Sequence, residues 1–281
     1  MQRIVEADRR LVDAELRRVL RFDKEVPARL AAAMRYAVLG RGKRIRPMLA
    51  LEAFRAAGGR DLAVVLPFCA GIEFIHTFSL IHDDLPSMDD DDFRRGRPSL
   101  HRKFDEATAI LAADGLFALG FEVFTDAPGP ADRKLAAIGV VCRAVGPSGM
   151  TGGQMLDIES DGLRSASRSE VTMTHRKKTA EFIAAALLAG AVLGGAAPAA
   201  QRRVRQAGLA LGMLFQMTDD LLDIGQKSEA ERTTMISSLG RAGTARRAAS
   251  EAMKSAKLFR SLGTDYRLLA GFPGLVLERT S

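Results

Sequence analysis

The sequence is poor in the residues that build β-sheets and cross-linked folds. Its 281 residues include no tryptophan, two tyrosines and two cysteines. Because strands favour aromatic and β-branched residues, this scarcity argues against a sheet-based fold. Cys69 and Cys142 lie far apart in the chain, which excludes a disulfide scaffold and the paired spacing of a structural zinc site.

The chain also lacks an apolar segment typical of a secretion signal near its start. The first stretch, MQRIVEADRRLVDAELRRVL, is charged throughout, and a cytoplasmic location is therefore expected. Residues 182–200 run without a charge over nearly the length of a membrane span, but they are mostly Ala and Gly and include Pro198. Such residues drive insertion into lipid weakly, so we predict a buried core helix and no stable membrane insertion.

What the sequence has in abundance is Ala, Leu and Arg, which are good helix formers. Apolar residues recur at three- and four-residue spacing, and no alternating pattern predicts a strand. The pattern predicts helices over about 7–22, 28–40, 43–58, 62–83, 104–124, 133–145, 169–195, 199–224 and 241–260. Since no linker rich in Pro, Gly or Ser divides the chain, we expect an all-α fold of roughly ten or more helices in a single domain, residues 1–281.

The formal net charge of +7 favours a polyanionic partner. Nucleic acid, an anionic membrane and a phosphorylated small molecule all fit that sign. The charge alone does not choose among them.

A first acidic cluster follows an apolar helical pattern. Six aspartates occupy the ten positions from 83 to 92, and Arg94 and Arg95 follow them. Like charges this dense resist joint ionisation unless a cation neutralises them. A solvated acidic loop is the simpler alternative for this cluster. Taken alone, the basic run GRGKRIRP at 40–47 would likewise be a solvated surface.

A second acidic cluster, FQMTDDLLD at 215–223, lies inside an apolar run. Asp219 and Asp223 are four residues apart, so a helix places both carboxylates on one face. Mg²⁺ relieves such repulsion, and it typically takes one or two carboxylates while keeping other positions for water and phosphate oxygens. Two clusters of this kind predict carboxylates around a metal-bound polyphosphate, with Arg or Lys neutralising the remaining charge.

Five short motifs, in this order, resemble those of the trans-isoprenyl diphosphate synthases, which include farnesyl and geranylgeranyl diphosphate synthases. They are GKRIRP at 42–47, EFIHTFSLIHDDLPSMDDDDFRRGRPSLH at 73–101, GGQMLD at 152–157, HRKKTA at 175–180 and FQMTDDLLD at 215–223. The resemblance implies a helical bundle around a central cavity, which usually works as a homodimer. It also implies condensation of isopentenyl diphosphate with an allylic diphosphate such as the dimethylallyl or geranyl compound.

The resemblance further assigns roles to single residues. About three Mg²⁺ ions would be held by Asp83, Asp84, Asp89, Asp219, Asp220 and Asp223. The isopentenyl diphosphate would be bound by Lys43, Arg46, His76 and Arg95. The allylic substrate and its reaction would involve Arg94, Lys178, Thr179, Gln216, Gln154, Phe78 and Ser79, with Thr179 and Gln216 directing oxygen dipoles at the carbocation.

Product length should depend on Phe78 and Ser79, which precede Asp83 by about one helical turn. An aromatic side chain at the position of Phe78 resembles the short-chain members of the family, in which it blocks the growing tail. We therefore expect the fifteen-carbon farnesyl diphosphate, with geranylgeranyl diphosphate as the alternative.

The chain departs from the family after Asp223. The segment 224–240 is shorter than usual and lacks a Gly-Lys pair that would contact the allylic diphosphate. Lys227 or Arg232 would have to replace that lysine, and near the end of the chain only Arg279 offers a basic group. The shortened loop leaves open a weakly active or non-catalytic partner subunit.

Two other classes fit less well. A terpene cyclase would not need the second diphosphate site that GKRIRP implies. A nucleic-acid binder is disfavoured because the basic residues lack interleaved aromatics.

Overall fold

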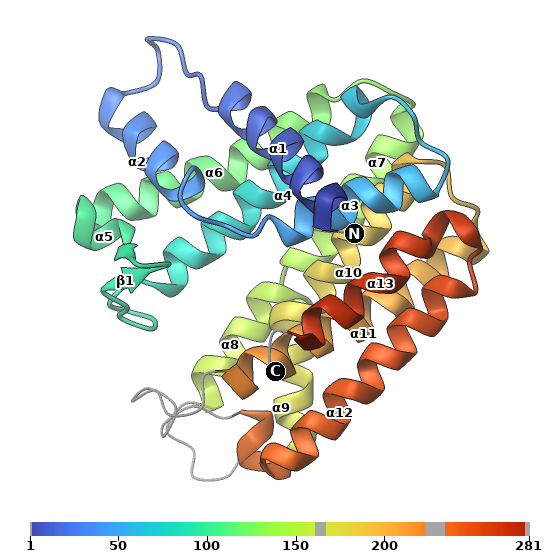
Figure 1. Ribbon diagram of the computed structural model, residues 1–281. Helices are drawn as coiled ribbons and strands as arrows, with labels where there is room; N and C mark the ends of the chain where they lie inside the picture. Colours follow the sequence, from blue (N-terminus) through green and yellow to red (C-terminus); the bar gives the residue numbers. More distant parts are fainter. Residues whose placement is uncertain (1, 161–166, 223–233, 279–281) are drawn as a thin grey trace. The chain divides into compact units, whose positions relative to one another are not determined.

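Nearly all of the described chain is helical. The computed structural model describes residues 2–160, 167–222 and 234–278, and Figure 1 shows its helices in sequence order. Within these residues the strands are β1 (Phe93–Arg94) and β2 (Arg97–Pro98), two residues each. The prediction of an all-α fold is confirmed.

The chain divides into two compact units, which are described separately. The first comprises Met1–Leu51 and Asp61–Lys134, and the second Glu52–Arg60 and Leu135–Ser281. A single synthase domain over residues 1–281 stays a prediction.

The first unit is built around a pair of long apolar helices, α4 and α6. Its elements besides the hairpin are α1 (Gln2–Val19), α2 (Ala28–Val38), the start of α3 (Ile45–Ala56), α4 (Leu62–Asp83), α5 (Leu100–Lys103) and α6 (Glu106–Asp126). Asp61 and Asp105 cap α4 and α6, each accepting a hydrogen bond from a first-turn amide. Such caps satisfy helix N–H groups that have no partner within the helix.

Small and aromatic residues together allow α4 and α6 to pack closely. A Cβ atom on Gly71 would lie 2.5 Å from the carbonyl oxygen of Gly120, so only glycine permits this approach. Beside this contact the rings of Phe68 and Phe124 stack at 4.5 Å, both fully buried. Burying one such ring contributes about 1.5–3 kcal/mol to folding. The end of α4 that carries the first acidic cluster therefore projects from a rigid core.

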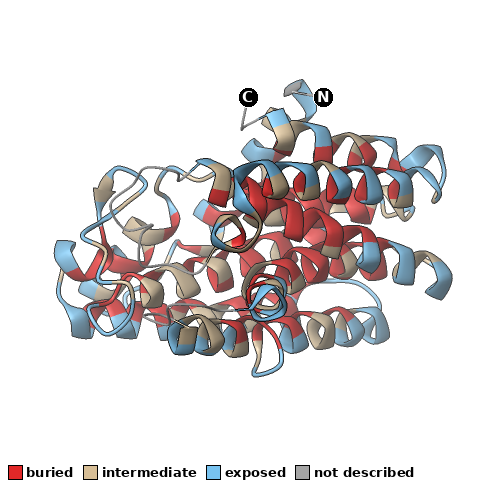
Figure 2. Cartoon of the chain, turned by 90° about the horizontal axis from the view of Figure 1, so that it is seen from below, coloured by how far each residue is buried: buried red, intermediate tan, exposed pale blue. Residues whose placement is uncertain are grey.

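The second unit surrounds the segment that the sequence predicted as a buried helix. Its elements are the remainder of α3, most of α7 (Ala131–Val145), α8 (Met150–Ser160), α9 (Arg168–His175), η1 (Arg176–Ala180), α10 (Glu181–Leu193), α11 (Pro198–Leu222), α12 (Met235–Arg260), η3 (Thr264–Tyr266) and α13 (Arg267–Leu277). Residues 182–193 are all buried except Leu188, and Figure 2 shows the buried positions in red along the helices. The prediction of a buried core helix holds for residues 182–193, whereas 194–200 form a turn and the exposed start of α11.

The helices α8 and α13 were not predicted, and two further stretches differ from their predicted form. The segment 169–195, predicted as one helix, is divided into α9, the π-helical turn η1 and α10. The helix predicted to start at residue 241 begins six residues earlier, at Met235. It bends at Gly240, whose φ is 67°. Glycine adopts this left-handed conformation without steric cost.

In the part of the chain that the structure describes, α4 and α6 are long and apolar enough to cross a membrane, judged by length and composition alone. Most of the apolar stretch of α4 is buried inside the protein. A core helix of this kind meets the same criteria as a membrane span.

Candidate active site

The first acidic cluster begins where α4 ends. Asp83 is the last residue of α4, Asp84 caps it, and Pro86 cannot continue the helix because it has no N–H to donate. The following loop turns back, since the amide of Asp89 donates a hydrogen bond to the carbonyl oxygen of Asp83 at 2.9 Å. The fold thus brings Asp83 and Asp89 together at the helix end.

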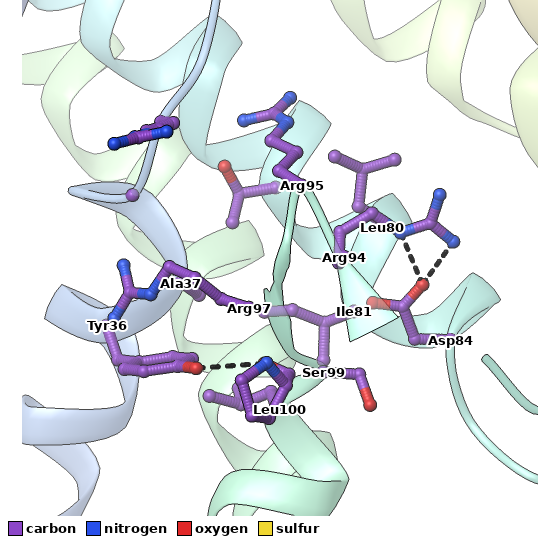
Figure 3. Close-up of a pocket in the computed structure, with 14 residues that line it drawn as sticks. Tyr36, Ala37, Leu80, Ile81, Asp84, Arg94, Arg95, Arg97, Ser99 and Leu100 are labelled. Carbon is purple, nitrogen blue, oxygen red and sulfur yellow. Dashed lines mark hydrogen bonds and ion pairs between the residues drawn. The ribbon is translucent and has the colours of Figure 1, made fainter. Parts of the chain in front are cut away.

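Asp84 is held by an arginine from the hairpin. Its Oδ1 atom accepts from Nε of Arg94 at 2.7 Å and also from Nη2 of Arg94, which donates to Asp91 at 2.8 Å as well. Asp84 is 3% exposed, and burial raises the pKa of its carboxyl group against the opposing effect of Arg94. Figure 3 shows this pair, and the burial of Asp84 distinguishes it from the exposed Asp90 and Asp92 of the same cluster.

The hairpin that carries Arg94 was not predicted from the sequence. Arg94 pairs with Arg97 across the two strands, and the turn residues Arg95 and Gly96 have φ angles of 54° and 75°. Two central residues with positive φ are typical of a type I′ turn, which matches the twist of the strands. The dipeptide Arg95-Gly96 was the available signal, but a strand of two residues is too short to show alternation.

Behind the hairpin lies a cavity of about 60 Å³ with a basic lining. Four arginines and one carboxylate contribute to it, namely Arg41, Arg94, Arg95, Arg97 and Asp84. The hydroxyl group of Tyr36 donates to the carbonyl oxygen of Pro98 at 2.9 Å, and Figure 3 shows Tyr36 beside Arg97 of the hairpin. The guanidinium of Arg97 lies 3.9 Å from the ring centroid of Tyr36. These contacts fix the hairpin against α2.

Three of the residues predicted to bind isopentenyl diphosphate come together in the first unit. Arg46 Nη1 lies 3.2 Å from His76 Nε2. The guanidinium of Arg95 lies over the glycine-rich segment, because a Cβ atom on Gly42 would be 2.7 Å from its Nη1. The fourth predicted residue, Lys43, is exposed on the same segment. The positive charges of Arg46 and Arg95 therefore lie close to His76, where the motif GKRIRP contacts α4 and the hairpin.

His76 is uncharged in this setting. Burial, together with the guanidinium groups of Arg46 and Arg95, lowers its pKa well below the usual 6.5. Because a guanidinium only donates, Nε2 of His76 must accept from Arg46, and the proton resides on Nδ1. A neutral imidazole of this tautomer offers one N–H donor to an anion.

Arg44, by contrast, is a buried structural residue. The sequence showed it only as one member of the basic run and did not predict this role. Arg44 is 4% exposed. It donates to Glu73 at 2.8 Å, to Asp13 at 3.0 Å and to the carbonyl oxygens of Val38 and Gly40. The signal in the sequence was Glu73, a single carboxylate inside the apolar helix α4, which needs a cationic partner when it is buried.

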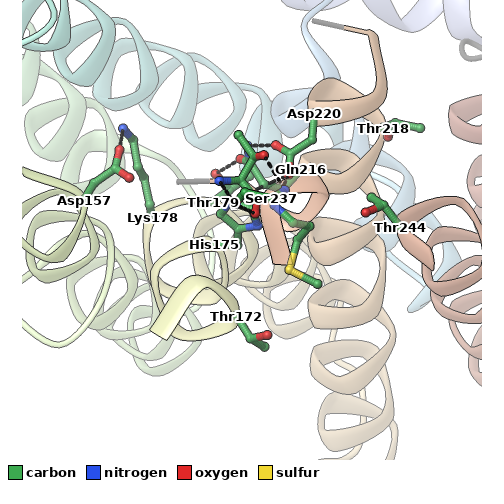
Figure 4. A network of polar contacts seen from close by, with 12 residues as sticks. Asp157, Thr172, His175, Lys178, Thr179, Gln216, Thr218, Asp220, Ser237 and Thr244 are labelled. Atoms are coloured by element: carbon green, nitrogen blue, oxygen red, sulfur yellow. Dashed lines mark hydrogen bonds and ion pairs between the residues drawn. The ribbon is translucent and has the colours of Figure 1, made fainter. Parts of the chain in front are cut away.

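In the second unit, η1 presents Lys178 and Thr179 to neighbouring helices. Lys178 Nζ donates to Asp157 of α8 at 2.5 Å, and the Thr179 hydroxyl donates to Gln216 Oε1 of α11 at 2.9 Å. Figure 4 shows these residues converging. The motifs GGQMLD, HRKKTA and FQMTDDLLD therefore meet at one place, and Asp157 joins the residues that the sequence singled out.

Gly153 makes this meeting possible. A Cβ atom at this position would lie 2.3 Å from the backbone nitrogen of Lys178, closer than any real Cβ contact. The next residue, Gln154, has its Oε1 atom buried without a hydrogen-bond partner in the described part of the chain. A buried amide oxygen of this kind is available to a ligand.

Asp219 and Asp220 lie side by side near the end of α11 but differ in exposure. Asp219 is half-buried, whereas Asp220 is buried and accepts from Gln216 and from the backbone amide of Met235. His175 Nε2 lies 4.0 Å from Asp220, and burial lowers the pKa of His175. Asp223, Lys227, Arg232 and Arg279 lie outside the described residues.

The described residues contain no cluster of three acidic, histidine or cysteine side chains close enough to hold a metal ion. The donor chemistry nevertheless fits Mg²⁺, which takes one or two carboxylates and completes its shell with water and phosphate oxygens. Asp83 with Asp89, and separately Asp219, provide such carboxylates at helix ends.

The arrangement matches known proteins in sequence and in fold. The sequence model of the family described as polyprenyl synthetase matches residues 27–236. The chain belongs to the polyprenyl synthetase family. It is thus an enzyme of the trans-prenyltransferase class.

Within the polyprenyl synthetase family, two relatives illustrate the similarity in sequence. A farnesyl diphosphate synthase of Geobacillus stearothermophilus is 46% identical over 71% of this chain and 68% of its own length. Geranylgeranyl pyrophosphate synthase 7 of Arabidopsis thaliana is 41% identical over 72% of this chain and 59% of its own length. The matched region thus spans about three fifths to two thirds of these relatives.

A solved structure extends the likeness to almost the whole chain. The geranyltransferase of Legionella pneumophila has a TM-score of 0.92 and 30% identity, covering 99% of this chain and 96% of its own. The motif-based identification of the polyprenyl synthetase family is confirmed.

Proposed function

We propose that this enzyme condenses isopentenyl diphosphate with an allylic diphosphate to form a short-chain trans-prenyl diphosphate, farnesyl diphosphate in the first place. The observation that carries the proposal is the convergence of Arg46, His76 and Arg95 beside the helix end that bears Asp83 and Asp89. A cationic group of this kind suits one diphosphate, and the carboxylates suit a second, metal-bound diphosphate.

Isopentenyl diphosphate would be bound by the cationic group in the first unit. Arg46 and Arg95 provide fixed guanidinium donors, Lys43 adds an ammonium group, and neutral His76 offers Nδ1–H. Arg44 takes no part, since Glu73 and Asp13 already neutralise it. Within the basic motif, Arg44 would therefore stabilise the fold, while Lys43 and Arg46 would bind the diphosphate.

The allylic diphosphate would be bound by carboxylate-held Mg²⁺ and by two basic side chains. The resemblance assigns about three Mg²⁺ ions to six aspartates, Asp83, Asp84, Asp89, Asp219, Asp220 and Asp223. Of these, we propose Asp83, Asp89 and Asp219 as the direct ligands, because Asp84 and Asp220 are already engaged by donors of the protein. When bound, Mg²⁺ supplies the charge that stabilises the departing diphosphate. Two basic side chains are predicted to contact the allylic diphosphate: Arg94, which Asp84 holds in the first unit, and Lys178, which Asp157 holds in the second.

Bond breaking and bond making then follow without a covalent enzyme intermediate. The allylic C–O bond breaks, the double bond of isopentenyl diphosphate attacks the resulting carbocation, and the proton released from the new chain passes to the free diphosphate. Thr179 and Gln216 direct oxygen dipoles at the positive carbon. Apolar walls exclude water, which would otherwise trap the cation.

Phe78 would limit the length of the product. Its ring lies 4.8 Å from that of Phe117 on α6, with Ser79 beside it one helical turn before Asp83. Two packed rings at this depth favour the fifteen-carbon product over the twenty-carbon one.

The deciding experiment is product analysis by chromatography and mass spectrometry. The purified chain would be incubated with Mg²⁺, isopentenyl diphosphate and, in turn, dimethylallyl, geranyl and farnesyl diphosphates. Farnesyl diphosphate from the first two primers is the expected result. A hydrocarbon released from an allylic substrate alone would indicate a cyclase, and no product with any primer would indicate a non-catalytic subunit.

The enzyme would act as a homodimer. Ile110 and Leu111 on α6 are 42% and 62% exposed, and less than half of the apolar stretch of this helix is buried in one chain. An apolar helix face open to water favours association with a second copy.

A further inference from the structure

The second aspartate of the motif at 219–223 has both carboxylate oxygens engaged by the protein. Asp220 is 5% exposed. Its Oδ1 accepts from Gln216 Nε2 at 3.1 Å, and its Oδ2 accepts from the backbone N–H of Met235 at 2.9 Å. In Figure 4 the carboxylate points to these donors on α11 and α12.

The contact with Asp220 determines which way the amide of Gln216 faces. A carboxylate only accepts hydrogen bonds, so Gln216 must turn its NH₂ group to Asp220. Its carbonyl oxygen then faces Thr179, whose hydroxyl group donates to it at 2.9 Å. The amide orientation follows from this network of donors and acceptors.

The same carboxylate fixes the start of α12. Met235 is the first residue of that helix, and its N–H is one of those without a partner inside the helix. Thr234 and Ser237 form a capping box beside it. Asp220 thus links the beginning of α12 to η1 through Gln216 and Thr179.

We propose that Asp220 is a positioning residue: it anchors α12 and holds the Gln216 carbonyl oxygen toward Thr179, while Asp219 provides the carboxylate for metal. The catalytic part of this inference rests on the proposed function, but the anchoring of α12 does not.

An exchange of functional groups tests the hydrogen-bond relay. In Asp220→Asn one oxygen becomes an NH₂ group, and the remaining oxygen can still accept from the N–H of Met235. The NH₂ group then meets Gln216, whose amide must turn over, so that its NH₂ group faces Thr179 and its carbonyl oxygen no longer does. The double variant Gln216→Glu with Asp220→Asn restores a matched set, because the new carboxylate at position 216 accepts from the new amide at position 220 and from Thr179. Gln216→Glu alone and Asp219→Asn are the controls.

Kinetics separate positioning from metal binding. We expect Asp220→Asn to lower kcat on the order of tenfold, with the Mg²⁺ concentration for half-maximal rate unchanged, and the double variant to recover most of the loss. Asp219→Asn should raise the Mg²⁺ requirement. A raised Mg²⁺ requirement in Asp220→Asn would overturn the proposal, as would a double variant no more active than Asp220→Asn.

Thermal unfolding of the metal-free protein provides a readout without activity. Asp220→Leu leaves the Met235 N–H without its acceptor and should lower Tm by about 2–4 °C. Asp220→Asn keeps one acceptor oxygen and should lower Tm less, and Asp219→Asn should not lower it. Equal Tm values for the wild type and Asp220→Leu would contradict the anchoring role. If the wild-type chain formed no prenyl product, the proposed function would fail while the Tm comparison would still decide the role of Asp220.

Discussion

At the scale of single residues, the basic motif at 42–47 combines two kinds of arginine. Arg44 is neutralised by Glu73 and Asp13, whereas Arg46 lies beside the neutral imidazole of His76. A buried charge with carboxylate partners holds structure. The proposed binding of isopentenyl diphosphate by Arg46 would give the same motif a second role.

The depressed pKa of His76 predicts a pH-dependent loss of stability. Below about pH 6.5 the unfolded chain binds a proton that the folded protein does not, so the free energy of unfolding should fall as pH decreases toward the folded pKa. His76→Gln keeps an acceptor for Arg46 but cannot titrate, and its stability should fall less over this range.

Urea unfolding of both proteins at about pH 7.5 and pH 5.5 measures the effect. His82 and His175 also have lowered pKa values and stay in both proteins, so the difference between the two belongs to His76. Parallel loss of stability in the two proteins would contradict the prediction.

Phe78→Ala should lengthen the product by at least one five-carbon unit. The ring of Phe117 lies behind Phe78, and Phe121 lies 5.1 Å from Phe117, so Phe78→Ala with Phe117→Ala should lengthen it further. Chromatography of the products measures chain length. Phe22→Ala, in the turn after α1, is a control that should leave the product unchanged, and an unchanged product in Phe78→Ala would refute this role.

At the scale of elements, close approach of η1 to its neighbours decides where Lys178 and Thr179 lie. Gly153 of α8 meets the backbone of η1, and Gly212 of α11 meets Ala180, whose Cα would be 2.4 Å from an added Cβ. Backbone atoms cannot move aside as a flexible side chain can. Two glycines therefore set the position of the π-helical turn.

Gly153→Ala should displace η1 and reduce catalysis. A methyl group 2.3 Å from the backbone nitrogen of Lys178 must push the turn away, and we expect kcat/KM to fall by about tenfold or more, with a lowered Tm. Gly274→Ala in α13 is the control, since nothing lies within 4 Å of its added Cβ. Steady-state kinetics and thermal unfolding measure both variants, and equal activity of Gly153→Ala and wild type would contradict the prediction.

At the scale of the whole molecule, the proposed homodimer depends on the exposed face of α6. Leu111→Asp places a charge on this face and should convert the dimer to a monomer, because an unpaired buried charge is costly. Size-exclusion chromatography with light scattering measures the mass.

Met253→Asp is the matched control for the dimer. Met253 is 68% exposed on α12, and its replacement should leave the mass unchanged. A monomeric wild type, or a Leu111→Asp variant that stays dimeric, would refute this interface.

The sequence by itself determined the fold class, because helix periodicity is a local pattern. The family, and the roles predicted for Asp83, Lys178 and Gln216, came from the resemblance of five motifs to those of the trans-isoprenyl diphosphate synthases. The hairpin at 93–98 and the π-helical turn at 176–180 were missed, because two- to five-residue elements leave no periodic pattern. The helices α8 and α13 were missed as well, since glycines, and in α13 also Pro273, interrupt their helical pattern.

Only the tertiary structure decided which charged residue meets which partner. Arg44 pairs with Glu73 across 29 residues, Lys178 with Asp157 across 21, and Asp220 with the Met235 amide across 15. Such partners are chosen by helix packing and burial, since a carboxylate removed from water must find a donor wherever the fold places one. Adjacent aspartates that look alike in the sequence therefore differ in role once the helices are packed.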